Sequence, residues 1–171
     1  MMLQGLPPRL ASNTRLVVLG SFPGEASLRA QQYYGHPRNQ FWPILTELFS
    51  NQPSVVCALP YAQRMQWLLE QGVGVWDVYA ACTREGSLDA NIQSAEINDL
   101  HKLRVWCPNL TAIAHNGGES YRHARITRTL GLPVYRLPST SPANASWSLQ
   151  RKRDAWRDVM VAVGLLRSGD A

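Results

Sequence analysis

The sequence predicts an α/β fold in which a parallel β-sheet carries helices on both of its faces. Short apolar runs rich in β-forming residues alternate along the chain with longer segments of helical periodicity, which is the pattern of βα units. The chain has 171 residues and contains no internal repeat or linker, so it suits one domain rather than two. We therefore expect a single domain over residues 1–171.

Four short apolar segments are interpreted as the strands of this sheet. The first of them, RLVVLG, is typical of a buried strand, because both faces of a parallel sheet are covered by helices. The expected strands span residues 15–20, 74–79, 110–114 and 133–137.

The segments between and after these strands show helical periodicity. In the first of them Phe41, Leu45 and Leu48 fall on one face, and Pro43 is tolerated because it lies near the helix start. The expected helices span residues 39–50, 61–71, 98–106, 118–130 and 147–166.

Composition and charge narrow the class of protein. Hydrophobic residues make up 45% and charged residues 17% of the chain, so we expect a packed core rather than disorder. No apolar run is long enough to span a membrane, and the N-terminal segment lacks the pattern of a signal peptide. We therefore expect a cytoplasmic protein that does not contact membranes.

The three cysteines, Cys57, Cys82 and Cys107, do not form a metal or redox motif. No C-x-x-C pair is present, and three thiols cannot complete the four-cysteine ligation of an iron–sulfur cluster. We expect free thiols in the core, no bound metal and no cofactor.

The net charge of +5 indicates a polyanionic partner, although a merely basic protein would show it too. Among the 17 basic residues only Lys102 and Lys152 are lysines. Arginine is favoured where phosphate is bound by planar, bidentate contacts, which again points to nucleic acid.

In folds of this class ligands bind at the carboxyl ends of the strands. Polar residues, glycine and proline concentrate in the four segments that follow the expected strands, and this agreement predicts a binding site there. The segments are 20–39, 77–91, 115–118 and 138–145.

The first of these segments carries the richest chemistry. Its Gly-x-x-Pro-Gly turn, which starts at Gly20, allows a ligand to approach the backbone closely. Tyr33 and Tyr34 offer faces for stacking on an unpaired base, and the amide of Asn39 can read a base edge or hold a water molecule. The plainer alternatives are a core role for the tyrosines and helix capping for Asn39.

The other segments supply candidate partners for the same site. His115 and Asn116 end the third strand and could meet a base or sugar, although a structural histidine is the alternative for His115. Asp77 and Asp89 are candidate bases, with a turn role favoured for Asp89. The run PSTSPANA offers three hydroxyls and an amide for phosphate oxygens, or forms an ordinary turn.

The blocks GSFPG, HPRNQFW and PSTSPANA together resemble the uracil-DNA glycosylase superfamily, and in particular its hypoxanthine-DNA (deoxyinosine) glycosylase branch. The resemblance runs from about Arg15 to Trp156 and includes the block VGVWDVYAACTREGSLDANI. It implies a three-layer α/β/α fold with a four-stranded parallel sheet, a base flipped into a pocket at the strand ends, and no metal. Several branches carry an acid or amide where this chain has Phe22, which favours hypoxanthine over uracil as the substrate base.

The resemblance and the residue chemistry together imply a monofunctional glycosylase that acts on double-stranded DNA containing a deaminated base, as a monomer. The two lysines fall outside the four segments, so a Schiff base is not expected. A damaged-DNA-binding module without catalysis and a hydrolase of free nucleosides or nucleotides remain open. The expected site comprises Asn39 for catalysis; Gly20, Ser21, Phe22, Tyr33, Tyr34, His115 and Asn116 for the base; and Arg38, Ser139, Thr140, Ser141 and Asn144 for the DNA.

Overall fold

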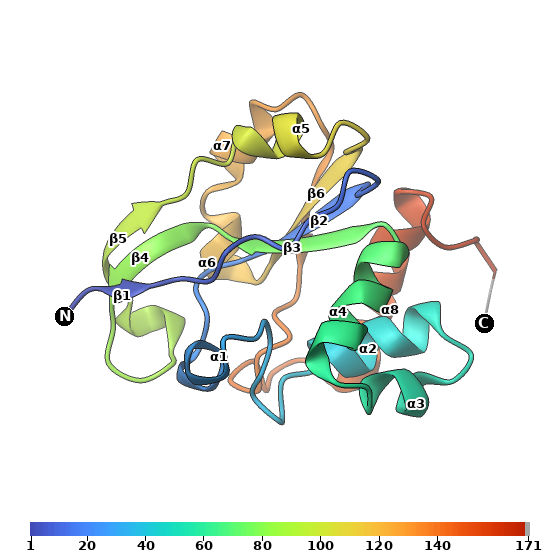
Figure 1. The fold of residues 1–171 in the computed structure, drawn as a ribbon, viewed down its shortest axis with the longest axis horizontal. Helices are drawn as coiled ribbons and strands as arrows, with labels where there is room; N and C mark the ends of the chain where they lie inside the picture. The colour runs from blue at the N-terminus through green and yellow to red at the C-terminus, as the bar shows by residue number, and fades with distance from the viewer. Residues whose placement is uncertain (170–171) are drawn as a thin grey trace.

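A four-stranded parallel sheet with the strand order β3-β2-β6-β7 forms the centre of the molecule (Figure 1). The computed structural model describes residues 1–169. All four predicted strands are present, and the third begins two residues later than predicted. They are β2 (Leu16–Gly20), β3 (Val73–Asp77), β6 (Ala112–Asn116) and β7 (Val134–Leu137).

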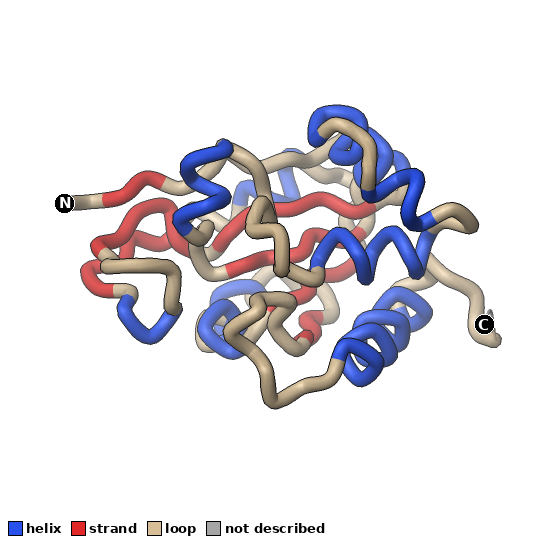
Figure 2. Tube along the Cα trace, turned by 90° about the horizontal axis from the view of Figure 1, so that it is seen from below, coloured by secondary structure: helices blue, strands red, loops and turns tan. Residues whose placement is uncertain are grey.

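Helices cover both faces of this sheet, so the predicted three-layer α/β/α arrangement is confirmed (Figures 1 and 2). Successive residues of β2 face opposite sides. Leu16 and Val18 belong to one apolar core, while Val17 and Leu19 belong to the other. The first core is covered by α2 (Phe41–Phe49), α4 (Tyr61–Glu70) and α8 (Leu149–Ala162), and the second by α5 (Lys102–Trp106) and α7 (Ala124–Arg128).

Several helices are shorter than their sequence patterns predict. The segment 118–130 is divided into α6 (Gly118–Tyr121) and α7, and the segment 98–106 is helical only in its second half, as α5. Two further helices lie in segments for which no helix was predicted. They are α1 (Glu25–Ala30) and α3 (Pro53–Cys57), of six and five residues.

A small antiparallel sheet, which the sequence did not predict, extends the fold beyond β3. It has the order β1-β4-β5, with β1 (Leu3–Gln4), β4 (Tyr79–Thr83) and β5 (Gln93–Ile97), and β4 begins two residues after β3 ends. The connection 84–92 contains the 3-10 helix η1 (Asp89–Asn91) and returns to the carboxyl end of the parallel sheet. The second sheet therefore contributes a loop to the region where the sequence predicts the site.

The cysteines are free thiols, as predicted: Cys82 and Cys107 are buried and Cys57 is half-buried. Within residues 1–169, no helix has both the length and the apolar character that crossing a membrane requires.

Candidate active site

A cavity of about 680 Å³ opens at the carboxyl ends of all four parallel strands. The strand register brings Gly20 of β2 opposite Asp77 of β3, and Asn116 of β6 opposite Leu137 of β7. All four residues line the cavity. The four segments that the sequence singled out therefore meet at one place.

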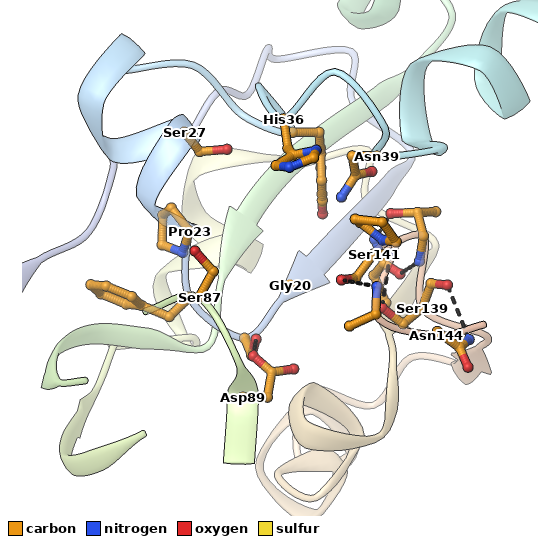
Figure 3. Close-up of a pocket in the computed structure, with 18 of the residues that line it drawn as sticks. Gly20, Pro23, Ser27, His36, Asn39, Ser87, Asp89, Ser139, Ser141 and Asn144 are labelled. Atoms are coloured by element: carbon orange, nitrogen blue, oxygen red, sulfur yellow. Dashed lines mark hydrogen bonds between the residues drawn. The ribbon is translucent and has the colours of Figure 1, made fainter. Parts of the chain in front are cut away.

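Three stretches of chain form the walls of this cavity, as Figure 3 shows. One runs from the turn after β2 through α1 to Asn39. The second is the connection between β4 and β5, which contributes Ser87 and Asp89. The third is residues 138–147, which we call the serine loop and which contributes Ser139 and Ser141.

Asn39 presents a hydrogen-bond donor to the cavity. Its Oδ1 accepts the backbone N–H of Phe41 at 2.9 Å, in an Asx turn that precedes α2. A backbone N–H can only donate, so the orientation of the amide is fixed and its Nδ2 is left for a ligand. In Figure 3 this nitrogen points into the cavity. The N-cap residue of α2 is Gln40, so Asn39 shapes the entry to the helix by this turn rather than as its cap, and the expected ligand role remains open to its Nδ2.

Tyr33 and Tyr34 have different surroundings. Tyr33 is buried, its hydroxyl donates to the carbonyl of Pro7 at 2.8 Å, and it belongs to the core. Tyr34 adopts a left-handed conformation with φ of 56°, which is unusual for a residue with a side chain. Its ring stacks on Phe41 with a centroid distance of 4.0 Å, so only the other ring face is available to a ligand. Both residues are part of the cavity lining.

Asp77 lies on the floor of the cavity and is 4% exposed. Its Oδ2 is sealed from solvent and has no hydrogen-bond partner among residues 1–169. Burial raises the pKa of Asp77 to about 7, with a further contribution from the charge of Asp89. The hydroxyl of Tyr34 is likewise buried and unpartnered within the described chain.

The connection between β4 and β5 is tied to the turn after β2. The hydroxyl of Ser21 donates to Asp89 Oδ1 at 2.6 Å, and the backbone N–H of Glu25 donates to Ser87 Oγ at 2.9 Å. Arg84 donates to the carbonyl of Pro23 at 2.7 Å. These bonds hold a second carboxylate, that of Asp89, at the edge of the cavity.

Internal hydrogen bonds shape the serine loop. The buried pair Asn116 and Thr140 exchanges two of them: Asn116 Nδ2 donates to Thr140 Oγ1, and Thr140 N donates to Asn116 Oδ1, both at 3.1 Å. The side-chain amide of Asn144 is engaged at both ends within the loop: its Nδ2 donates to the carbonyl of Ser139, and its Oδ1 accepts from the hydroxyl of Ser146. Ser139 and Ser141 each accept a backbone N–H, which leaves their own O–H groups to donate. The two serines therefore remain candidate phosphate ligands, whereas Thr140 and Asn144 shape the loop.

Two predicted site residues do not line the cavity. His115 is fully buried on the side of the sheet covered by α6 and α7, and its ring nitrogens contact the hydroxyls of Ser120 and Thr127 at 2.8 Å each. Burial lowers the pKa of His115 to about 4, so the ring is neutral at pH 7. This arrangement is that of a structural histidine, which was the alternative considered for His115. We therefore no longer count His115 among the candidate ligands of the base. Arg38 is exposed beside Asn39 and stays a candidate for DNA contact.

Phe22 lines the cavity but is 6% exposed, because its ring packs into the second core. The guanidinium of Arg84 lies 5.3 Å from the ring centroid. At most one edge of Phe22 is thus available to a ligand.

Sequence reasoning missed several residues of the cavity wall. Ser87 lies in the predicted site segment 77–91, but in a connection between two strands that were not predicted, so it was not named as a candidate. The exposed Arg136 of β7 and the half-buried Trp147 after PSTSPANA also line the cavity. The strand-end rule could have found Arg136, because it directly precedes Leu137, the last residue of β7.

Comparisons with known proteins agree with this architecture. Residues 7–160 match the family described as the Uracil DNA glycosylase superfamily. The chain is 37% identical to a hypoxanthine DNA glycosylase of Methanosarcina barkeri, covering 91% of this chain and 96% of that protein. A hypoxanthine DNA glycosylase of Methanosarcina acetivorans is 35% identical, with 93% and 98% covered. A solution NMR structure from M. acetivorans, proposed to be a uracil DNA glycosylase, superposes with a TM-score of 0.84 at 35% identity over 95% of this chain and 99% of that chain.

Proposed function

The chain belongs to the uracil DNA glycosylase superfamily, and from that premise we propose that it removes hypoxanthine from deoxyinosine in duplex DNA. Two relatives that match almost the whole chain bear the name hypoxanthine DNA glycosylase. The reaction is hydrolysis of the N-glycosidic bond, which leaves an abasic site and the free base.

The observation that carries this proposal is the amide of Asn39, whose nitrogen faces a cavity at the strand ends. Hypoxanthine presents acceptors at O6 and N7, as guanine does. As the bond breaks, negative charge develops on the base and positive charge on the sugar. A fixed N–H donor aimed at the base stabilises the first of these charges. Asn39 is therefore assigned to the base rather than to activation of water.

The cavity volume of about 680 Å³ is within the usual range for small-molecule sites and suits a flipped nucleotide. Flipping the base out of the duplex costs a few kcal/mol, least at a mispair, and contacts to the flanking phosphates offset that cost. We assign those contacts to the free O–H groups of Ser139 and Ser141, which line the cavity, and to the exposed residues Arg38 and Arg136.

A water molecule, rather than a lysine, is proposed as the nucleophile. No lysine lines the cavity. Lys152 is buried and donates to Gln40 Oε1 at 2.8 Å, while Lys102 is exposed on α5. Neither amine lies in the cavity where the sugar would bind, so a Schiff base is not expected and the enzyme is assigned to the monofunctional class.

We further propose that the enzyme acts as a monomer. Because its substrate is DNA, we also assign the protein to the cell interior.

The test is a single-turnover assay on labelled duplexes that carry one deoxyinosine or one deoxyuridine, followed by alkali to cleave abasic sites. We expect abasic product from deoxyinosine with the wild type and its loss with Asn39→Ala. Tight binding to the deoxyinosine duplex without product would instead support a binding module. Cleavage of free deoxyinosine in preference to the duplex would support a nucleoside hydrolase.

A further inference from the structure

Asp77 is buried, yet its Oδ2 has no hydrogen-bond partner among residues 1–169. We propose that Asp77 is the general acid of the reaction and protonates the departing hypoxanthine at N7. This inference rests on the proposed function, since it assigns a role within the same cavity.

The position of Asp77 meets the first requirement for such a role. It is the last residue of β3, it lines the cavity floor, and it is 4% exposed. Opposite it lies Gly20, where an ideal Cβ would come within 2.5 Å of Asp77 Oδ1. The absence of a side chain at Gly20 thus makes the space that the carboxyl group occupies.

The hydrogen bonding of Asp77 meets the second requirement. A buried carboxylate is normally held by N–H or O–H donors, because leaving the charge unpaired is costly. Within residues 1–169, Oδ2 has no such donor. A neutral carboxyl group needs fewer donors and carries a proton that it can transfer, so this environment favours the acid form.

The surroundings of Asp77 also favour its protonated form. Burial and the nearby carboxylate of Asp89 raise the pKa of Asp77 to about 7, and Arg84 opposes them. The guanidinium of Arg84 is itself held by the carbonyls of Pro23 and Gly86. The neighbouring phenols of Tyr33 and Tyr34 stay neutral, because burial raises the pKa of each. An acid whose pKa lies near the working pH is well matched to proton transfer.

The chemical step balances without any further reactant. The proton of Asp77 passes to N7 while the bond between C1′ and N9 breaks and its electron pair enters the imidazole ring. Hypoxanthine leaves as a neutral molecule, and Asp77 is left as a carboxylate. The oxygen of a water molecule bonds to C1′ and releases a proton to solvent. Asp77 regains a proton from solvent after the base departs.

The direction in which the rate changes with pH distinguishes a general acid from a general base. If Asp77 donates a proton, the rate falls as the pH rises through about 7, because the acid form is lost. If Asp77 instead accepts the proton of the attacking water, the rate rises over the same range. If the carboxyl group is only structural, the pH profile is independent of it.

The experiment measures the single-turnover rate on a deoxyinosine duplex from pH 5.5 to 9. The proteins are the wild type, Asp77→Asn and the matched control Asp99→Asn, whose side chain is exposed and lies outside the cavity. Asp77→Asn keeps the shape of the side chain and can donate a hydrogen bond but not a proton. We expect it to be slower by about 10²–10⁴-fold near pH 6.5, which is the usual range for loss of general acid catalysis.

Two further results are expected. The rate of the wild type and of Asp99→Asn falls about tenfold per pH unit above pH 7, whereas Asp77→Asn shows no such fall. Binding of the duplex by Asp77→Asn stays within about threefold of the wild type, because the lost group acts on the bond that breaks rather than on affinity.

A rate for Asp77→Asn equal to that of the wild type would overturn the proposal. A fall in rate that is still seen in Asp77→Asn would come from another group, and it would overturn the proposal too. Should Asp77→Asn fail to fold, the wild-type profile alone decides, and a rise through pH 7 rejects the acid role. Absence of abasic product from the wild type at every pH would overturn the proposed function itself.

Discussion

Gly20 and Asp77 lie side by side at the ends of two neighbouring strands, and a side chain on one would collide with the other. An ideal Cβ on Gly20 would lie 2.5 Å from Asp77 Oδ1 and 3.3 Å from the hydroxyl oxygen of Tyr34. Real Cβ atoms essentially never approach so closely, so one partner must move. Glycine at the end of β2 is therefore a condition for the geometry of the cavity floor.

The variant Gly20→Ala tests this relationship. We expect a loss of about 1–3 kcal/mol in the free energy of unfolding, as for other overpacked sites, and a displaced Asp77. Denaturant unfolding of Gly20→Ala, Asp77→Ala and the double variant forms a cycle. The collision disappears when the carboxyl group is removed. In the Asp77→Ala background, Gly20→Ala should therefore lower the free energy of unfolding much less than it does in the wild type. Equal costs in both backgrounds would show that the strain lies elsewhere.

Replacements of Asn39 should separate its two roles. Asn39→Asp keeps an acceptor for the N–H of Phe41 but replaces the donor that faces the cavity with negative charge. We expect unfolding free energy within about 0.5 kcal/mol of the wild type and a glycosylase rate at least about 10²-fold lower. Asn39→Ala should lose similar activity and about 1 kcal/mol of stability as well. Full activity in Asn39→Asp would show that the N–H donor of Asn39 is not needed for the reaction.

The buried carboxyl group of Asp77 should make stability depend on pH in an unusual direction. Its folded-state pKa of about 7 lies above the ordinary 3.8, so between these values the folded protein holds a proton that the unfolded chain has released. This bound proton stabilises the folded state. The stabilisation is complete below pH 3.8 and is lost as the pH rises to about 7, which lowers the free energy of unfolding by on the order of 4 kcal/mol.

Chemical unfolding of the wild type and Asp77→Asn between pH 4 and 8 measures this effect. Asp77→Asn should gain stability relative to the wild type as the pH rises, while the control Asp99→Asn should follow the wild type. Parallel curves for the wild type and Asp77→Asn would mean that Asp77 ionises as freely in the folded chain as in the unfolded one.

Arg38 should contribute to DNA affinity without contributing to base choice. It is exposed beside Asn39 and outside the cavity, which suits a contact to phosphate. Arg38→Ala should weaken binding equally for inosine-containing and ordinary duplexes and should reduce the slope of log K against log salt by about 1. Arg125→Ala, an exposed change on α7 outside the cavity, serves as the control. An unchanged salt slope in Arg38→Ala would exclude the phosphate contact.

Sequence reasoning located the central sheet because its strands carry a strong signal. The five residues of β2 are all buried, so an unbroken apolar run marks the strand. In β5 all five residues are exposed, and a strand of polar residues at the edge of a small sheet leaves no such pattern. The loop that brings Ser87 and Asp89 to the cavity depends on that strand. The strand-end rule placed segment 77–91 at the site and Asp89 was a candidate base, but nothing in the sequence singled out Ser87.

The candidate site was predicted where it depends on strand ends and missed where it depends on side-chain direction. Asn116 and His115 are adjacent, yet they face different surroundings because successive residues of a strand point to opposite faces. His115 follows Ile113 toward the core under α6 and α7. The strand-end rule places both residues near the cavity, and only the alternation along β6 separates the one that lines it from the one that does not.

The most direct test of the proposed function is to identify the molecule that leaves the DNA. The purified protein is incubated with a duplex that carries one deoxyinosine, and the small-molecule fraction is analysed by mass spectrometry while the strands are sized without alkali. We expect free hypoxanthine in an amount equal to the abasic sites, with both strands intact. No released base, or a strand cut beside an intact deoxyinosine, would contradict it.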